Sequence, residues 1–131
     1  MESNKETTKS YLTLNDISAY KQAFELSNFV WDVVVKFDFF AKDTVGKQFV
    51  RSIDSVSANI AEGFGRCGKK DKIKFYRIAN GSLKEALDWN EKCKRRGLLD
   101  EAEYKQVFSI LNDLPREINQ LIKYTNEKLK V

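Results

Sequence analysis

Three charged side chains in the middle of the sequence could carry out acid–base chemistry. Glu62 and Arg66 are four residues apart, and Glu85 belongs to the next helical segment. A carboxyl group serves as a general acid only where a cleft raises its pKa, and nothing in this spacing requires a cleft. The sequence also has no histidine, the commonest general base and metal ligand. We therefore predict that the protein is not an enzyme and has no catalytic residue, no metal site and no cofactor.

A second candidate site is a run of positive charge between residues 66 and 77. It holds six basic residues and one acidic residue, Asp71, whereas the rest of the chain is nearly neutral. Lys70, Lys74 and Arg77 recur at spacings of four and three, which places them in one stripe on a helix. The stripe begins at a helix N-terminus, where anions are favoured. The alternative to an anion site is a solvated face. The residues that we predict to contact the phosphates of RNA or DNA are Arg66, Lys69, Lys70, Lys72, Lys74 and Arg77.

The element that must position this segment is the helix predicted just before it. Its apolar residues recur at helical spacing, and a neighbouring line of small residues lets a second helix approach closely. A polar line on the same helix ends in Asn59 and Glu62, so we expect hydrogen bonds to the following helix that fix the register of the two. The predicted network consists of Asn59, Glu62, Ser82 and Glu85, with Arg66 or Arg51 as a further partner.

Helical periodicity without a strand pattern predicts an all-α protein, an antiparallel up-down-up-down four-helix bundle. The first helix is expected after an N-cap at Asn15 or Asp16, and a short link at residues 42–44 leads to the second. Pro115 is expected to kink the fourth helix. The predicted helices span about residues 16–40, 45–66, 69–96 and 100–130, within a bundle domain at 14–131 that follows a flexible tail at 1–13.

The sequence contains a signal for the end of the third helix and a signal for the start of the fourth. Gly97 follows a cluster of basic residues that suits a helix C-terminus. Asp100 and Glu103 have the spacing of a capping box, in which each side chain binds the backbone N–H of the other. We therefore expect a tight antiparallel hairpin.

The first predicted helix is apolar over a wide arc, because two neighbouring lines of apolar residues run along it. One neighbour within the chain would not cover so much apolar surface. We therefore predict that this helix also forms a subunit interface in a homo-oligomer. The residues predicted for that interface are Leu26, Phe29, Val33 and Phe37.

The chain has 131 residues and a formal net charge of +4, and this length is typical of a single domain. No apolar run approaches the roughly 20 residues of a membrane span, and the N-terminal residues lack the apolar segment of a signal peptide. We therefore expect a cytoplasmic protein with no membrane partner. Cys67 and Cys93 do not form a CxxC pair, so both are expected to be free thiols.

The order of these motifs resembles the signature of bacterial four-helix-bundle proteins named for 23S rRNA intervening sequences. The likeness covers roughly residues 14–130 and includes the GLLDEAEY hairpin at 97–104. Two departures are small: Gly68 stands where the family usually has a serine N-cap, and Lys72 stands where an aromatic residue is common. The motifs that carry the resemblance are SVSANIAEGFGR at 55–66, Phe75, Ile78-Ala79 and GSLKE at 81–85.

The resemblance implies a homopentamer of antiparallel bundles that forms a ring-like barrel and has no known catalytic activity. A similar bundle is the accessory protein of diversity-generating retroelements, in which a basic pentamer binds nucleic acid and a reverse transcriptase. Together with the residues, this favours a non-enzymatic oligomer that binds RNA, a ribonucleoprotein or DNA through its basic segment. The alternative is an oligomeric scaffold that binds another protein and has no role with nucleic acid. No small-molecule substrate is predicted.

Overall fold

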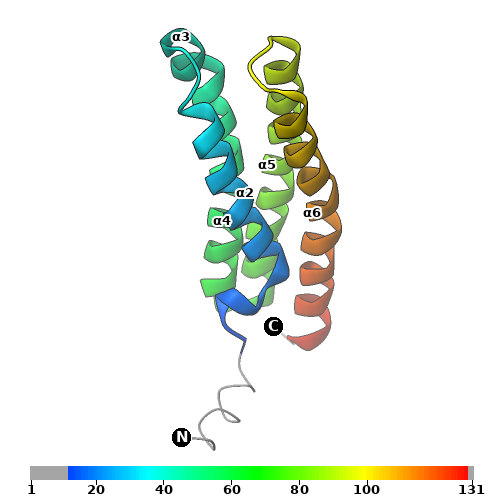
Figure 1. Cartoon of the computed structure of the whole chain (residues 1–131). Helices are drawn as coiled ribbons and strands as arrows, with labels where there is room; N and C mark the ends of the chain where they lie inside the picture. The colour runs from blue at the N-terminus through cyan, green and yellow to red at the C-terminus, as the bar shows by residue number, and fades with distance from the viewer. Residues whose placement is uncertain (1–11, 130–131) are drawn as a thin grey trace, which may run out of the picture.

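The computed structural model describes residues 12–129, whose long helices pack side by side as a four-helix bundle (Figure 1). Successive helices run in opposite directions along the bundle. The predicted all-α bundle is confirmed. Most of the predicted N-terminal tail, residues 1–11, lies outside the described part of the chain. The helices that form the bundle are α2 (Ser18–Val34), α4 (Lys47–Gly65), α5 (Lys69–Arg95) and α6 (Glu101–Lys128).

The first long helix is shorter than the sequence predicts, because α2 ends at Val34 and not near residue 40. Just beyond it, the Phe37 N–H donates to the Val34 carbonyl in a tight turn (2.9 Å). The Asp38 side chain then starts the next helix by accepting from the Ala41 N–H (3.0 Å). The link between the first two long helices therefore lies at residues 35–38.

The link that the sequence predicts at residues 42–44 is helical in the structure. A short helix, α3 (Phe39–Ala41), continues into one π-helical turn, η2 (Lys42–Gly46), and then into α4. Before α2, a single 3-10 turn, η1 (Leu14–Asp16), opens the described chain. Pro115 lies inside α6, and the helix continues past it to Lys128.

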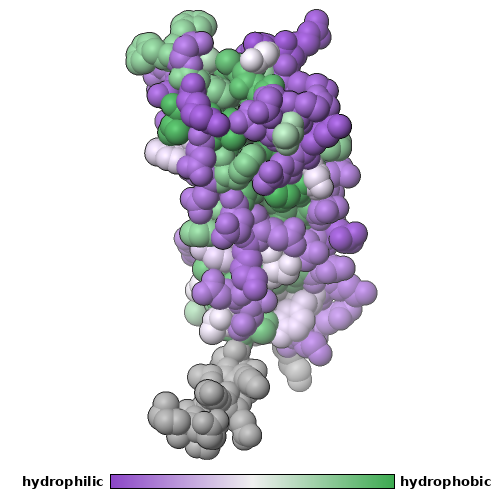
Figure 2. Space-filling view, viewed as in Figure 1, coloured by the Kyte–Doolittle hydropathy of each residue, from purple (hydrophilic) through white to green (hydrophobic). Residues whose placement is uncertain are grey.

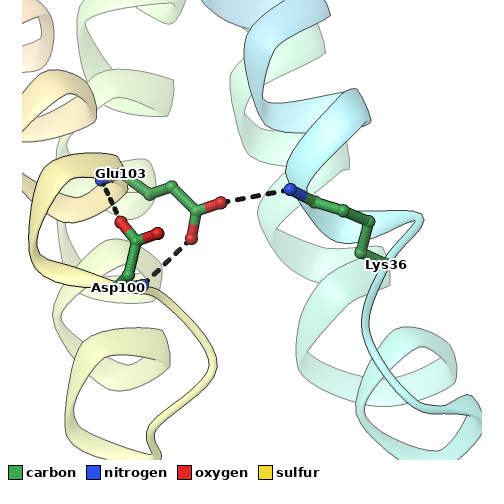
Figure 3. Close-up of polar contacts among 3 residues, drawn as sticks. All are labelled: Lys36, Asp100 and Glu103. Atoms are coloured by element: carbon green, nitrogen blue, oxygen red, sulfur yellow. Dashed lines mark hydrogen bonds and ion pairs between the residues drawn. The ribbon is translucent and has the colours of Figure 1, made fainter.

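The turn between α5 and α6 forms as the sequence predicts. Gly97 has a φ of 72°, a conformation that glycine adopts without strain. The Asp100 side chain accepts from the Glu103 N–H (2.8 Å), and the Glu103 side chain accepts from the Asp100 N–H (3.0 Å), so the capping box is complete. Glu103 also pairs with Lys36, just beyond α2, at 3.3 Å between Nζ and Oε2 (Figure 3). This capping box thus ties α6 to the end of α2.

The core lies between the facing sides of the helices, and α4 packs mainly against α5 and α2. At Gly63, α4 and α5 approach each other closely. A Cβ atom at this position would lie 2.9 Å from the Lys72 carbonyl oxygen and 2.7 Å from the Tyr76 ring. The small residue at position 63 therefore sets the distance between these two helices. The largest α4 side chains in the core, each at most 1% exposed, are Phe49, Ile53, Val56 and Ile60.

The side chains predicted for a subunit interface lie inside the protomer. Leu26, Val33 and Phe37 are buried, and Phe29 is half-buried against the same core. The wide apolar arc of α2 has two neighbours within the chain, since α4 and α6 both contact it. These two helices cover the part of the arc that contains the predicted interface residues, whereas Phe24 and Trp31 remain exposed. This corrects the assignment for Leu26, Val33 and Phe37, because their side chains are not available to another subunit, and Phe29 is only partly exposed.

Other apolar side chains remain exposed, and Figure 2 shows a hydrophobic area toward the α3 end of the bundle. The exposed apolar residues include Phe24 and Trp31 on α2 and Val35 at its C-cap, which are 46%, 56% and 43% exposed. On α3, Phe39 and Phe40 are largely exposed. None of the helices within residues 12–129 is long and apolar enough to cross a membrane.

Candidate nucleic-acid interface

The basic segment lies at the end of the bundle where α4 ends and α5 begins, which we call the α4–α5 end. Arg66 is the C-cap residue of α4, and Gly68 is the N-cap residue of α5. Gly68 has an extended backbone, and no side chain accepts a hydrogen bond there as a cap. The first turn of α5 therefore offers backbone N–H groups beside a cluster of cations, an arrangement that favours anions.

Arg66 is held by contacts within the protein. Its guanidinium pairs with Glu62 one turn earlier on α4 (2.8 Å) and with Asp71 in the first turn of α5 (3.5 Å). It also lies over the Phe75 ring, 4.7 Å from the ring centroid. Because these partners come from both helices, Arg66 joins the end of α4 to the start of α5.

Lys69 and Lys72 bind the carbonyl oxygens of helix ends. The Lys69 ammonium donates to the Asn126 carbonyl in the last turns of α6 (3.2 Å), and the Lys72 ammonium donates to the Phe64 carbonyl at the end of α4 (2.7 Å). Cations at these positions complement the helix dipole and satisfy carbonyls that lack an intrahelical partner. Burial lowers the pKa of Lys72 by removing water from its charged form.

Lys70, Lys74 and Arg77 form the exposed part of the basic segment. They lie on one face of α5 at helical spacing, and each is exposed. None of the three pairs with an acidic side chain of the described chain. Lys74 does lie near the Phe75 ring, at 5.9 Å from the centroid. We call these three residues the basic stripe.

The predicted polar network between α4 and α5 is smaller than the sequence suggests. The Ser82 hydroxyl forms a hydrogen bond with Ser55 across the two helices (2.8 Å between oxygens). Asn59 supports this contact by donating to the carbonyl and the hydroxyl of Ser55, at 2.8 and 2.9 Å. Ser55 is therefore the centre of the network, although the predicted set contains Asn59 and Ser82 without it.

The two carboxylates of that predicted network differ in what they contact. Glu62 binds Arg66 and is about half exposed, and Glu85 accepts from the Trp89 indole N–H (3.1 Å) on the solvent side of α5. Glu62 is therefore linked to α5 through Arg66, which also pairs with Asp71, and Arg66 is one of the further partners that the sequence predicts. The hydrogen bond of Glu85 lies within α5, which corrects its assignment as a link to α4. Neither carboxylate is enclosed, so the geometry that general acid catalysis needs is missing at both.

The other groups that could support chemistry are two cysteines, which are free thiols as predicted. Cys67 is exposed, and Cys93 is fully buried. Burial raises the pKa of the Cys93 thiol to about 11, which keeps it protonated and unreactive near neutral pH. Within residues 12–129, no cluster of three or more His, Cys, Asp or Glu side chains could hold a metal ion.

A cavity of about 440 Å³ lies at the α4–α5 end, on the side of α5 that faces α6. Ile17, Tyr76 and Thr125 are the buried part of its lining, and Tyr124 is 44% exposed. Burial raises the pKa of Tyr76 to about 12, although a hydrogen bond with Thr125 opposes this effect. Lys72 and Lys128 add positive charge to the cavity. Sequence reasoning missed this site, because its lining comes from segments that are far apart along the chain and meet only in the folded bundle.

The comparisons with known proteins bear on family and fold. The sequence pattern described as 23S rRNA-intervening sequence protein matches residues 15–120. A crystal structure of a protein with unknown function from the S23 ribosomal protein family of Bacteroides thetaiotaomicron is similar to this chain, with a TM-score of 0.71. The match covers 80% of this chain and 98% of that one at 20% identity, so it concerns the fold alone. A search of curated proteins found no match.

Proposed function

The chain belongs to the 23S rRNA-intervening sequence protein family, and from that premise we propose that it is a non-enzymatic cytoplasmic protein that binds RNA or a ribonucleoprotein. The surface that makes the contact is the basic stripe of Lys70, Lys74 and Arg77. The observation that carries this proposal is that all three cations are exposed on one helix face without an acidic partner within residues 12–129. Cations without such partners are available to phosphates.

The proposal divides the basic segment into two parts with different roles. Arg66, Lys69 and Lys72 hold the ends of α4, α5 and α6 together through the contacts described above. We call these three residues the platform, because their contacts stabilise the end of the bundle from which the basic stripe begins. Because the stripe starts in the first turns of α5, the partial positive charge of the helix N-terminus adds to its attraction for anions.

We further propose that the protein assembles as a homo-oligomer, a ring-like pentamer. The support within the protomer is the exposed apolar surface of α2 and its C-cap, which includes Phe24, Trp31 and Val35. Exposed apolar patches of this kind mark protein interfaces, and tryptophan is enriched among the residues that dominate binding. A ring would present several copies of the basic stripe and raise the avidity for a long nucleic acid without any new contact.

A salt titration with an RNA of mixed sequence tests the nucleic-acid proposal. We expect the logarithm of the association constant to fall linearly with the logarithm of salt concentration. Changing Lys70, Lys74 and Arg77 together to Gln should reduce the slope by about 2–3 for each protomer that contacts the RNA. The control changes three exposed cations elsewhere, Lys84, Arg95 and Arg116, to Gln. Equal losses in the two variants, or no binding at low salt, would contradict the proposal.

The second candidate function is a scaffold that binds another protein. It is favoured by the apolar end of the bundle, where Phe39 and Phe40 are 80% and 77% exposed. In that case the change of the basic stripe to Gln would leave partner binding intact, whereas a change of Phe39 and Phe40 to Ser would abolish it. The two functions therefore separate by which variant loses its partner.

A further inference from the structure

The cavity at the α4–α5 end has the lining of a site for a flat aromatic ligand. We propose that it receives one unpaired base of a single-stranded nucleic acid whose phosphates lie along the basic stripe. This inference rests on the proposed function and adds to it, because it specifies single-stranded over double-stranded nucleic acid. The cavity has a volume of about 440 Å³, which is within the range of about 300–1,000 Å³ that is common for small-ligand sites.

The walls of the cavity suit a base because they combine aromatic and aliphatic surface. Phe64, Tyr76 and Tyr124 contribute rings, and Leu121 contributes an aliphatic side. Tyr124 is 44% exposed, so its ring is open to stacking from outside. Aromatic side chains bind unpaired bases by stacking, whatever the base, because every base has a π face.

Polar groups in the cavity could hold the edge of the base. The hydroxyls of Tyr76 and Thr125 belong to side chains of its buried lining. The Thr125 hydroxyl donates to the Leu121 carbonyl (2.9 Å). Each hydroxyl retains acceptor capacity, which the exocyclic amino or ring N–H groups of a base can use.

Positive charge connects the cavity to the basic stripe. Lys72 lines the cavity and stands between Lys70 and Lys74 in the sequence of α5, so the stripe and the cavity occupy two sides of the same helical turns. Lys128 adds a second ammonium from α6, and Lys69 bridges to the Asn126 carbonyl on the same helix. A strand that follows this charge around α5 would bring one base over the cavity. Single-stranded nucleic acid can splay a base out in this way, whereas a duplex keeps its bases paired.

The test uses an oligouridine with one 2-aminopurine, alone and paired to a complementary strand, and the full-length protein. We expect the single strand to bind more tightly than the duplex, with a change in 2-aminopurine fluorescence on binding. Tyr124→Ala should weaken single-strand binding about tenfold and leave duplex binding unchanged, because stacking on one aromatic ring is lost. Tyr124→Phe should bind like the original protein. The matched control is Phe108→Ala, an exposed aromatic residue on α6 outside the cavity lining.

The outcomes separate this inference from the proposed function. Binding of both probes with equal affinity, or an equal effect of Tyr124→Ala and Phe108→Ala, would overturn the base site and leave the phosphate contacts standing. Failure of both probes to bind at low salt would overturn the proposed function and the base site together. Dodecanoate binding that depends on Tyr124 and that the oligouridine does not displace would assign the cavity to an amphipathic anion and overturn the inference.

Discussion

Gly63 on α4 lies so close to Tyr76 on α5 that a Cβ atom at position 63 would be 2.7 Å from the Tyr76 Cε1 atom. The same Cβ would be 2.9 Å from the Lys72 carbonyl oxygen, which is part of the α5 backbone and cannot rotate away. Gly63→Ala should therefore force the two helices apart. We expect a loss of about 1–3 kcal/mol in the free energy of unfolding, measured by urea denaturation.

Gly81 provides the matched control for this change. It is also a glycine inside a long helix, but a Cβ atom there would meet nothing within 4 Å. Alanine is favoured over glycine in a helix interior by about 1 kcal/mol, so Gly81→Ala should stabilise the protein. Opposite signs for the two substitutions are expected. A gain in stability at both positions would contradict the close contact of α4 and α5.

The contacts of Glu103 allow its two roles to be separated. Its carboxylate accepts from the Asp100 N–H and also pairs with the Lys36 ammonium (Figure 3). Glu103→Ala removes both contacts and should cost about 1 kcal/mol of stability, mostly from the missing cap. Glu103→Gln keeps a side-chain acceptor for the cap, and Lys36→Met removes only the exposed ion pair, so each should cost less than about 0.5 kcal/mol. Thermal unfolding of the three variants would measure this, and equal losses in all three would contradict it.

The exposed ring of Trp31 should control assembly. The proposed oligomer needs an apolar surface outside the core, and Trp31 is 56% exposed on α2. Trp31→Lys should shift the mass measured by light scattering from a multiple of 15.2 kDa to 15.2 kDa. The control, Phe108→Lys, places the same charge at an exposed aromatic residue of α6 and should leave the mass unchanged. A protomer mass for the unmodified protein would rule out the proposed assembly.

The fold could be predicted from the sequence because helical spacing and cap residues are local signals. The capping box of Asp100 and Glu103 is an example, since both partners lie within one turn. The end of α2 could not be found in the same way. Apolar residues continue through Phe37, Phe39 and Phe40, so the periodicity hides the break at Asp38.

The candidate site could be located from the sequence but not divided into its parts. The excess of basic residues identifies residues 66–77 as a candidate anion site. Lys69 and Lys72 donate to the backbone carbonyls of Asn126 and Phe64. Every residue has a backbone carbonyl, so the pattern of side chains in the sequence does not predict which carbonyl a lysine will bind. The same holds for α2, where the arc of Leu26 and Val33 is covered by two helices that arrive later in the chain.

The buried Cys93 and Tyr76 predict a loss of stability at alkaline pH. Burial raises the pKa of Cys93 from 9.0 to about 11 and that of Tyr76 from 10.0 to about 12. Both groups are neutral when protonated, so the unfolded chain ionises first as the pH rises. The stability is therefore fully present below about pH 9 and falls through about pH 11–12, by on the order of 2 kcal/mol for each group.

Urea denaturation at a series of pH values would measure this loss. Tyr76→Phe removes one of the two ionising groups and should make the decline above about pH 10 shallower, although it also loses the hydrogen bond to Thr125. The slope of stability against pH is the informative quantity, because a constant loss from the missing hydrogen bond does not change it. An unchanged slope would show that Tyr76 does not contribute.

Arg66 and Arg77 provide the sharpest comparison within the basic segment, because the same residue type stands in two different settings. Arg66 is bound by Glu62 and Asp71, whereas Arg77 is exposed and has no acidic partner within residues 12–129. Arg77→Gln should lower the salt slope of RNA binding by about 1 for each phosphate that the protein no longer neutralises, and it should leave stability unchanged within about 0.5 kcal/mol. Arg66→Gln should leave the slope nearly unchanged and cost up to about 1 kcal/mol of stability, because its ion pairs are half exposed. If Arg66→Gln lowers the slope as much as Arg77→Gln, then RNA competes with Glu62 and Asp71 for Arg66, and the division of the basic segment into a platform and a stripe is wrong.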